Sequence, residues 1–464
     1  MSFVTEFNNI MWGWVLAVIL LGTGLVYSVT MGFPQIRCFK HIARSLKSTM
    51  KSEDGGVSGF AALCAAVGGQ VGTGSLVGVA SALAAGGPGA LFWMWLTAIF
   101  GMVLSFGEAT LGQLFHEKDK NGNYYGGSSY YMTKGLGNKP LAIAYALTTI
   151  VAIGVFIAML QNNSIAAAVT DVIPVSPWIP GIIVTILAAV IVLGGVKKIT
   201  DAASLIVPFM AVAYVVITIV IILTHLSEVP GMFATIFKQA FNFEAAAGGV
   251  AGYTIKEAVR NGVARGLFSN DAGNGAAAGM HASAKVKHPA NQGFSAMFGT
   301  FMTTIVICTC TGIAILLTGV IDTGLEGVNL VQAAFSTTLG VIGRYFILIV
   351  TFLFCFTTLI ADMFYGEVGI RYLLKDKAVD SNKAVRIFHI LALIPVTIAA
   401  ALPLPVIWNL IDFFVAFLVL FNVYALFRML KYVRYVLNDY LKQIGSGREE
   451  PVWDENTDIK KLVK

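Results

Sequence analysis

Charged residues are scarce in this chain, and their scarcity limits the class of protein it can be. Asp, Glu, Lys and Arg make up 12% of the 464 residues, whereas hydrophobic residues make up 57%. A soluble globular chain is about 25% charged. The mean hydropathy of +0.77 therefore predicts a polytopic membrane protein. At about 20 residues for each span, there is room for about ten to twelve membrane-spanning helices.

Cysteine is also scarce, and its placement argues against disulfides and metal sites. The five cysteines show no metal-ligand spacing, and four of them lie in apolar runs. We interpret all five as small packing residues: Cys38, Cys64, Cys308, Cys310 and Cys355. The phosphate-binding pattern Gly-x-x-x-x-Gly-Lys-Ser/Thr is absent, which argues against coupling to ATP. The N-terminus has no basic n-region before its first apolar run, which indicates a retained span rather than a cleaved signal peptide.

The hydrophobic runs predict an all-α fold of about eleven membrane-spanning helices, with no separate soluble domain. The expected spans are 11–33, 57–84, 88–114, 140–166, 178–196, 200–224, 254–284, 290–319, 343–373, 385–402 and 406–430. Two further stretches, 230–250 and 330–338, are interpreted as helices at the membrane interface.

Basic residues predict the orientation of these spans. If the N-terminus lies outside the cell, all but five of the 31 Lys and Arg residues fall in segments that are then cytoplasmic. The five exceptions are Lys238, Lys256, Arg260, Arg265 and Arg344. This bias predicts an external N-terminus and a cytoplasmic C-terminus, and it accounts for the net charge of +6 without a nucleic-acid partner.

The span 57–84 is interrupted by glycines. It contains Gly68, Gly69, Gly72, Gly74 and Gly78, together with the polar residues Gln70, Thr73 and Ser75. Each glycine costs about 1 kcal/mol in a helix interior, so this segment favours a broken helix. Unwound backbone persists at membrane depth only where it lines a cavity or is buried in protein. The alternative is close helix packing through small residues four apart.

The span 254–284 carries a second interruption, with an acidic residue near its middle. Ser269, Asn270 and Asp271 precede Gly273 there. A half-helix that starts near Ala272 would direct its N–H groups at a carboxylate, and the end of the preceding half near Leu267 would offer carbonyls to a cation. The alternative is that Asp271 only caps the second half. Two broken helices in matching halves of a chain indicate the central site of a secondary transporter.

Two other groups of polar residues lie deep in apolar runs. Thr357 and Thr358 provide adjacent hydroxyls within the span 343–373, although a Thr in a membrane helix usually bonds its own backbone. Glu108 lies within a span, where we expect it to pair with a basic residue across helices. His281 is interpreted as a hydrogen-bonded structural residue.

Several short motifs resemble the alanine or glycine:cation symporter family. They are GQVGTGS at 69–75, GGPGA at 86–90, FWMW at 92–95, RGLFSNDAG at 265–273, KHP at 287–289 and YGE at 365–367. The resemblance extends over about residues 10 to 430. It implies a leucine-transporter-type core of two inverted five-helix repeats, 57–224 and 254–430. One extra helix (1–33) would precede them and a cytoplasmic tail (431–464) would follow.

The resemblance also implies which residues form the site. The broken helices would bind the amino acid, with a sodium site between the first of them and the threonine pair. The expected substrate-binding residues are Gly69, Gln70, Gly72, Thr73, Gly74, Ser75, Ser269, Asn270, Asp271 and Gly273. The expected sodium ligands are Ala66, Gly69, Thr357 and Thr358.

The chain departs from the family pattern at several of these positions. The family commonly has Asn at Ser75, Glu at Asp271, Met at Asn274 and Asp at Thr303. It often has Gly-Trp before its Tyr-Tyr-Gly-Glu run, where this chain has ADMFY at 361–365. These changes suggest a relocated charge and an altered pocket. We therefore add Asp362 to the substrate-binding residues, as a partner of the substrate amine or the cation. The alternative is that Asp362 caps a helix or pairs with a structural partner such as Arg371.

The leading functional hypothesis is a sodium-coupled symporter that imports alanine or glycine across the cell membrane, with sodium as the co-transported ion and no organic cofactor. A second hypothesis keeps the carrier fold but changes the amino acid or amine substrate, or makes the proton the coupling ion. A membrane-embedded enzyme is the remote alternative. It would need a nucleophile with a base in reach, and His281 is the one histidine well inside a span, with no metal-ligand spacing beside it. A channel fits broken helices that face one central site less well than a carrier does.

Overall fold

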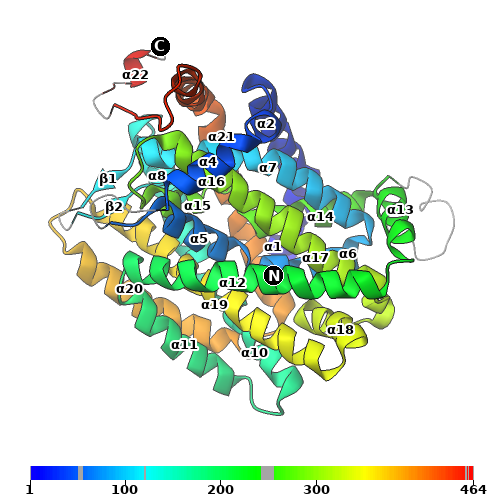
Figure 1. The fold of residues 1–464 in the computed structure, drawn as a ribbon. Coiled ribbons are helices and arrows are strands. Elements are labelled where there is room, and N and C mark those ends of the chain that lie inside the picture. The colour runs from blue at the N-terminus through cyan, green and yellow to red at the C-terminus, as the bar shows by residue number, and fades with distance from the viewer. Residues whose placement is uncertain are drawn as a thin grey trace.

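The computed structural model is helical almost throughout. It describes residues 2–50, 56–119, 122–241, 255–454, 457 and 459–462. Its one hairpin pairs β1 (Glu117–Lys118) antiparallel to β2 (Tyr124–Tyr125). Figure 1 shows α12 crossing the front of the molecule, with α10 and α11 below it and α16 and α17 above it.

The helices follow one another with short connections. In chain order they are α1 (Ser2–Ile10), α2 (Leu16–Thr30), α3 (Pro34–Arg37), α4 (Phe39–Ser48), α5 (Gly59–Gln70), α6 (Val77–Gly86), α7 (Gly89–Leu114), α8 (Ser128–Lys134), α9 (Lys139–Val151), α10 (Ala158–Val172), α11 (Trp178–Val192), α12 (Val196–Thr224), α13 (Val229–Ala240), α14 (Ile255–Asn270), α15 (Ala277–Ala282), α16 (Pro289–Thr300), α17 (Thr309–Leu317), α18 (Gly327–Leu339), α19 (Val341–Leu374), α20 (Ser381–Ala399), α21 (Leu404–Gly445) and α22 (Ile459–Leu462). π-Helical turns η1 (Met11–Val15), η3 (Ala152–Ile157) and η5 (Phe301–Cys308) join α1 to α2, α9 to α10 and α16 to α17.

Most of the expected spans correspond to long apolar helices. Within the described residues, eight helices are long and apolar enough to cross a membrane, and α5 with α6 adds a ninth as one bent span. The span expected at 178–196 is the shorter apolar helix α11. The span expected at 254–284 is divided into α14 and α15, and residue 254 lies outside the described part. The chain is a multi-pass membrane protein, but its count of spans is smaller by these criteria than the eleven expected.

Both terminal spans are longer than the hydrophobic runs predicted. The first helical segment already begins at Ser2 rather than at residue 11, and its end at Asn8 and Trp12 is bonded to α21. The last helix continues to Gly445 rather than ending at 430, because Val433, Val436 and Tyr440 keep one side of it buried. A helix that packs against protein needs no continuous apolar run.

The two expected interfacial stretches are also helical. α18 covers 330–338, but it buries Leu330, Val331 and Phe335 and packs against α19, so its apolar face points into the protein. α13 covers the first part of 230–250 and packs against α7. The remainder of that stretch, 242–250, lies outside the described residues.

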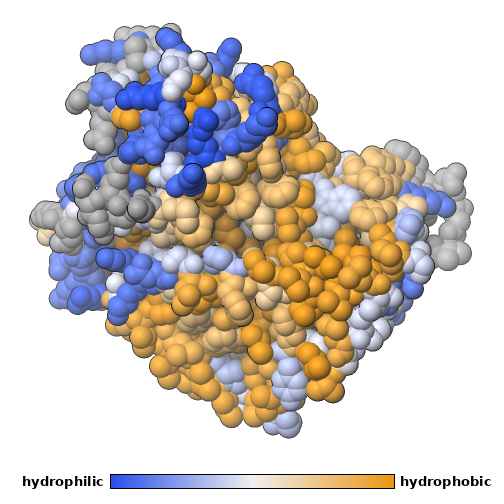
Figure 2. Space-filling view, viewed as in Figure 1, coloured by the Kyte–Doolittle hydropathy of each residue, from blue (hydrophilic) through white to orange (hydrophobic). Residues whose placement is uncertain are grey.

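The outer surface has the polarity of a membrane protein. On α12, Leu205, Phe209 and Val212 are exposed apolar side chains. Figure 2 shows hydrophobic residues over the lower part of the molecule and hydrophilic residues gathered around α4 and the C-terminal segment. Exposed apolar side chains of this extent are expected to contact lipid.

The interior consists of two groups of helices that meet at the breaks. In one group α7 packs against α14 and α16, and α14 packs against α6. In the other α10 packs against α19 and α20, and α11 packs against α20. α5 contacts both groups, through α16 on one side and α19 on the other. This packing positions the ends of the broken helices at the centre of the molecule.

Candidate functional site

The first break separates α5 from α6. Gly59–Gln70 and Thr73–Gly86 are inclined to each other by 57°. Between them the amide and the hydroxyl of Thr73 both donate to Oε1 of Gln161, at 3.0 and 3.1 Å. Gln161 comes from α10, in the other group of helices, and no sequence pattern had pointed to it. Its amide oxygen replaces helical hydrogen bonds that the break removes.

Two of the glycines allow close approach of other elements. A Cβ on Gly72 would lie 2.3 Å from Oγ1 of Thr358, and one on Gly74 would lie 2.9 Å from Cα of Ser269. Gly78 has only the carbonyl oxygen of Thr73 nearby, at 3.7 Å. Close packing and chain breaking therefore occur together, and Gly72 and Gly74 bring the first break into contact with α19 and with the second break.

The second break lies between α14 and α15. Asp271 has a left-handed backbone (φ 55°), as do Gly273 (φ 95°) and Gly275 (φ 83°). The Asn270 side chain accepts from the amide of Ala272 at 3.0 Å, and Nδ2 of Asn274 donates to Oδ1 of Asp271 at 2.8 Å. The second half-helix begins at Ala277 and not near Ala272. Asp271 is consequently not its N-cap, and the unwound segment is longer than the sequence predicted.

Side chains near the breaks bond across the helices around them. The hydroxyl of Ser269 lies 3.0 Å from that of Thr304, and Thr311 donates to the carbonyl of Ser75 at 2.7 Å. Oε1 of Gln70 is buried without a hydrogen-bond partner in the described residues. Thr303 donates to the carbonyl of Thr300 in its own helix.

Glu108 supports the second break from α7. Its Oε1 accepts from the amide of Gly273 at 2.9 Å and from Nδ2 of Asn422 at 2.6 Å, and Asn422 also donates to the Gly273 carbonyl at 3.0 Å. The expected basic partner was therefore wrong, because the carboxylate binds amides. An ionisable residue within a span was the signal for a functional role, but its partner could be found only in three dimensions.

We expect Glu108→Ala to destabilise the protein substantially. The substitution leaves the Gly273 amide and Asn422 without their shared acceptor, and each unsatisfied buried group costs about 1–3 kcal/mol. Thermal unfolding of the purified protein in detergent measures the effect. Glu108→Gln keeps one acceptor oxygen and should lose much less stability. Equal unfolding temperatures for wild type and Glu108→Ala would contradict this role.

The expected threonine pair meets the end of α5. Oγ1 of Thr358 donates to the carbonyl oxygen of Gly68 at 2.6 Å, and Oγ1 of Thr357 lies 3.3 Å from the same oxygen. In the sequence, Gly68 lies between Ala66 and Gly69, the two residues whose carbonyls were expected to bind sodium. Each hydroxyl has one proton to donate, and each also lies 3.0 Å from a carbonyl oxygen of α19 itself. Three oxygens of the kind that bind sodium at unwound helices are thus adjacent.

Asp362 lies one turn further along α19. Its side chain is buried, and Oδ2 has no hydrogen-bond partner among the described residues. Arg371, the structural partner named as an example, instead forms an ion pair with Glu367 at 2.7 Å, so that pairing was wrong. The hydroxyl of Tyr365 is likewise buried without a partner, and a Cβ on Gly69 would lie 2.9 Å from it. Asp362 and Tyr365 are polar groups available to a ligand.

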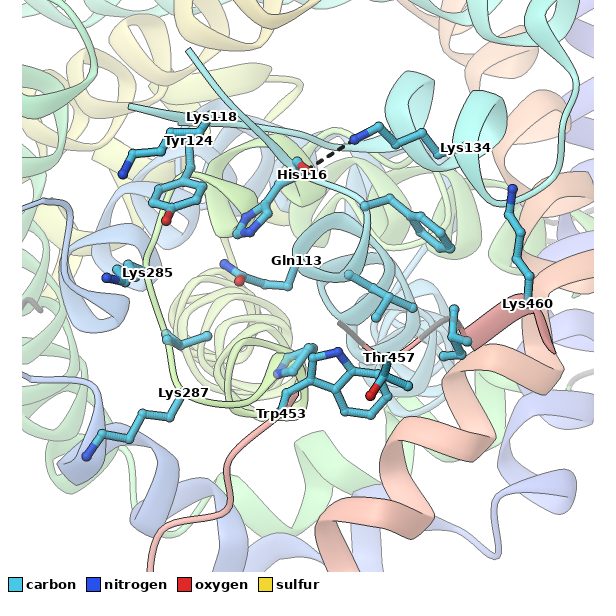
Figure 3. Close-up of a pocket in the computed structure, with 15 residues that line it drawn as sticks. Gln113, His116, Lys118, Tyr124, Lys134, Lys285, Lys287, Trp453, Thr457 and Lys460 are labelled. Carbon is cyan, nitrogen blue, oxygen red and sulfur yellow. Dashed lines mark hydrogen bonds between the residues drawn. The ribbon is translucent and has the colours of Figure 1, made fainter. Parts of the chain in front are cut away.

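The site does not coincide with a cavity of about 790 Å³ elsewhere in the molecule, which is lined by residues such as Gln113, His116 and Trp453. Figure 3 shows that its lysines do not converge, since Lys118 and Lys285 extend to one side and Lys460 lies on the other. Lys134 donates to the carbonyl of His116 at its edge. This cavity contains no residue of the two breaks.

A family model described as the sodium:alanine symporter family matches residues 1–455. The chain belongs to this family. Its members and the relatives found are transporters, not enzymes. The family resemblance drawn from the motifs is thereby confirmed.

Several relatives align over nearly the whole chain. The Sodium/alanine symporter AgcS of Methanococcus maripaludis is 37% identical, over 89% of this chain and 90% of that protein. The Probable sodium/glutamine symporter GlnT of Bacillus subtilis is 36% identical, over 95% and 91%. The Putative sodium/proton-dependent alanine carrier protein YrbD of Bacillus subtilis is 36% identical, over 98% and 95%.

Proposed function

We propose that this protein imports a small neutral amino acid, alanine or glycine, together with sodium. A sodium-coupled amino-acid symporter is the activity that its family and its named relatives support. The observation that carries the proposal is the meeting of the Thr357 and Thr358 hydroxyls with the Gly68 carbonyl at the first break. The second break packs closely against the first, since a Cβ on Gly74 would lie 2.9 Å from Cα of Ser269.

The coupling follows from this adjacency. Sodium would bind the hydroxyls of α19 and the carbonyl end of α5, so it would hold α19 and α5 together. The amino acid would bind between the breaks, with the unwound backbone at Gly72–Ser75 and at Asp271–Gly273 as its polar partners. Because each ligand would order the same backbone, the binding of each would raise the affinity for the other.

Transport would follow the alternating access of inverted-repeat carriers. We include in the proposal the repeats 57–224 and 254–430, the preceding helix 1–33, and an external N-terminus with a cytoplasmic C-terminus. The two helix groups that meet at the breaks would move relative to each other about the fixed site. Supporting this, the basic residues concentrate in the segments that this orientation makes cytoplasmic.

Specific observations favour one alternative substrate and one alternative coupling ion. A relative is named a sodium/glutamine symporter, and the unpartnered Asp362 carboxylate gives the site an extra acidic group. A different amino acid is therefore the second candidate. The name of another relative includes the proton, so a proton is the second candidate for the coupling ion.

Uptake of labelled alanine and glycine into proteoliposomes tests the proposal. We expect an inward sodium gradient to drive accumulation, and a potassium gradient of the same size to drive none. Unlabelled glutamine and other amino acids, added as competitors, rank the substrates. Accumulation driven by a pH gradient without sodium would overturn sodium coupling. Sodium-driven uptake of another amino acid, with alanine ignored, would overturn the assignment of substrate.

A further inference from the structure

The carboxylate of Asp362 faces the same side of α19 as the residues that line the first break. Four residues before it, Thr358 reaches the Gly68 carbonyl. Three residues after it, the Tyr365 hydroxyl approaches Gly69. Residues three or four apart lie on one face of a helix, and four residues span about 6 Å along its axis. Asp362 is thus about 6 Å along α19 from the proposed sodium ligands.

Among the described residues, no basic side chain forms an ion pair with Asp362. The acid that interacts with it is Asp271. The other titratable groups that interact with it are Tyr365 and Cys355, on its own helix. The basic residue further along α19, Arg371, is paired with Glu367.

A buried acid without a counter-charge either takes up a proton or is paired by a cationic ligand. An isolated carboxylate in an apolar interior is costly unless it is paired. Asp271 and Asp362 together carry two negative charges when ionised. One sodium ion balances one of them, whereas a zwitterionic neutral amino acid adds no net charge. A substrate with a second ammonium group would balance the other.

The unsatisfied hydrogen-bonding groups also favour an ammonium group beside Asp362. Asp271 already accepts from Asn274 through Oδ1, whereas Oδ2 of Asp362 and the hydroxyl of Tyr365 have no partner among the described residues. An ammonium group donates up to three hydrogen bonds and accepts none. The carboxylate of Asp362 and the phenol oxygen of Tyr365 are both able to accept them.

We propose that Asp362 is a specificity-determining residue that binds an ammonium group on the substrate side chain, so that the site takes short diamino acids as well as the neutral amino acid. Asp362 lies about one helical turn along α19 from the proposed sodium ligands. This distance favours substrate side chains of two or three carbons, as in 2,4-diaminobutyrate and ornithine. This inference rests on the proposed function, because it assigns a substrate class to the same site.

Competition against sodium-driven uptake of labelled alanine tests the inference. The two competitors are 2,4-diaminobutyrate and 2-aminobutyrate, which share a carbon chain and differ in the distal amine. In the wild type we expect 2,4-diaminobutyrate to compete at least about tenfold better, the effect of one charge-assisted hydrogen bond. In Asp362→Asn the ratio of their half-inhibitory concentrations should fall to about one. Glu367→Gln, an acid lost from the same helix outside the site, should keep the wild-type ratio.

The outcomes separate this inference from the proposed function. Sodium-driven alanine uptake with no advantage for 2,4-diaminobutyrate, or with an advantage that Asp362→Asn retains, would overturn the inference alone. A second result would also overturn it: 2,4-diaminobutyrate has no advantage, and a proton gradient stimulates alanine uptake in the wild type but not in Asp362→Asn. That result would indicate that Asp362 binds a proton instead. If alanine is not transported, calorimetric binding of 2,4-diaminobutyrate to purified wild type and Asp362→Asn decides the inference independently.

Discussion

Thr358→Ala is expected to raise the sodium concentration for half-maximal alanine uptake by at least about tenfold, because an interaction with a charged group contributes about 1.5–3 kcal/mol. Oγ1 of Thr358 makes the shorter of the two threonine contacts with the Gly68 carbonyl, at 2.6 Å. Removing it takes away a proposed sodium ligand and the link between α19 and α5. Initial uptake rates in proteoliposomes, measured over a range of sodium concentrations, give the shift.

Two variants on the same helix control for a general loss of packing. Thr358→Ser keeps the hydroxyl and should stay close to the wild type. Thr351→Ala removes a hydroxyl that is fully buried two turns earlier and has no hydrogen-bond partner in the described residues. It should leave the sodium dependence unchanged. A sodium dependence that is the same in Thr358→Ala and in the wild type would rule out Thr358 as a ligand.

Gly72→Ala is the second substitution with a large expected effect, and it should abolish uptake. The new Cβ would lie 2.3 Å from Oγ1 and 2.6 Å from Cβ of Thr358, and 2.6 Å from Oε1 of Gln161. Thr358 is β-branched on a long helix and has little rotamer freedom. Gln161 is held by its bonds to Thr73. The break would therefore have to move away from α19, which separates the oxygens proposed to bind sodium.

Gly78→Ala is the matched control, six residues further along the same broken span. Its Cβ would meet only the Thr73 carbonyl oxygen at 3.7 Å, which is an ordinary contact. It lies in α6, where Ala favours the helix by about 1 kcal/mol over Gly. Uptake and unfolding temperature should match or exceed those of the wild type. Equal uptake by Gly72→Ala and Gly78→Ala would mean that Gly72 serves helix packing only.

The relation between sequence and structure differs between the two breaks. The density of glycine between Gly68 and Gly78 was sufficient to predict the first break, because glycine disfavours helix wherever it lies. The position of Asp271 predicted the second break, but the sequence pattern underestimated the length of the unwound segment. Left-handed backbone at Asp271, Gly273 and Gly275 extends the unwound segment to Ala276, and no local propensity required that.

The partners of the site residues were less predictable. The sequence marked Thr357, Thr358 and Glu108 as unusual in an apolar setting, but it predicted a basic partner for Glu108 that the described residues do not provide. It did not indicate Gln161 or Asn422, which are 88 and 314 residues away in the chain from the groups that they bind. A polar residue on an amphipathic or apolar helix carries no local signal of which distant backbone it will satisfy.

The sequence by itself determined the class of the protein and the positions at which its helices break. Long continuous apolar runs and the cost of unpaired backbone in lipid favour membrane-spanning helices, and glycine clusters are local features. Only the tertiary structure decided that Thr358 reaches Gly68, that Glu108 supports Gly273, and that Asp362 has no ion-pair partner among the described residues. These contacts depend on how two groups of helices pack, because packing alone brings side chains from distant segments within hydrogen-bonding distance.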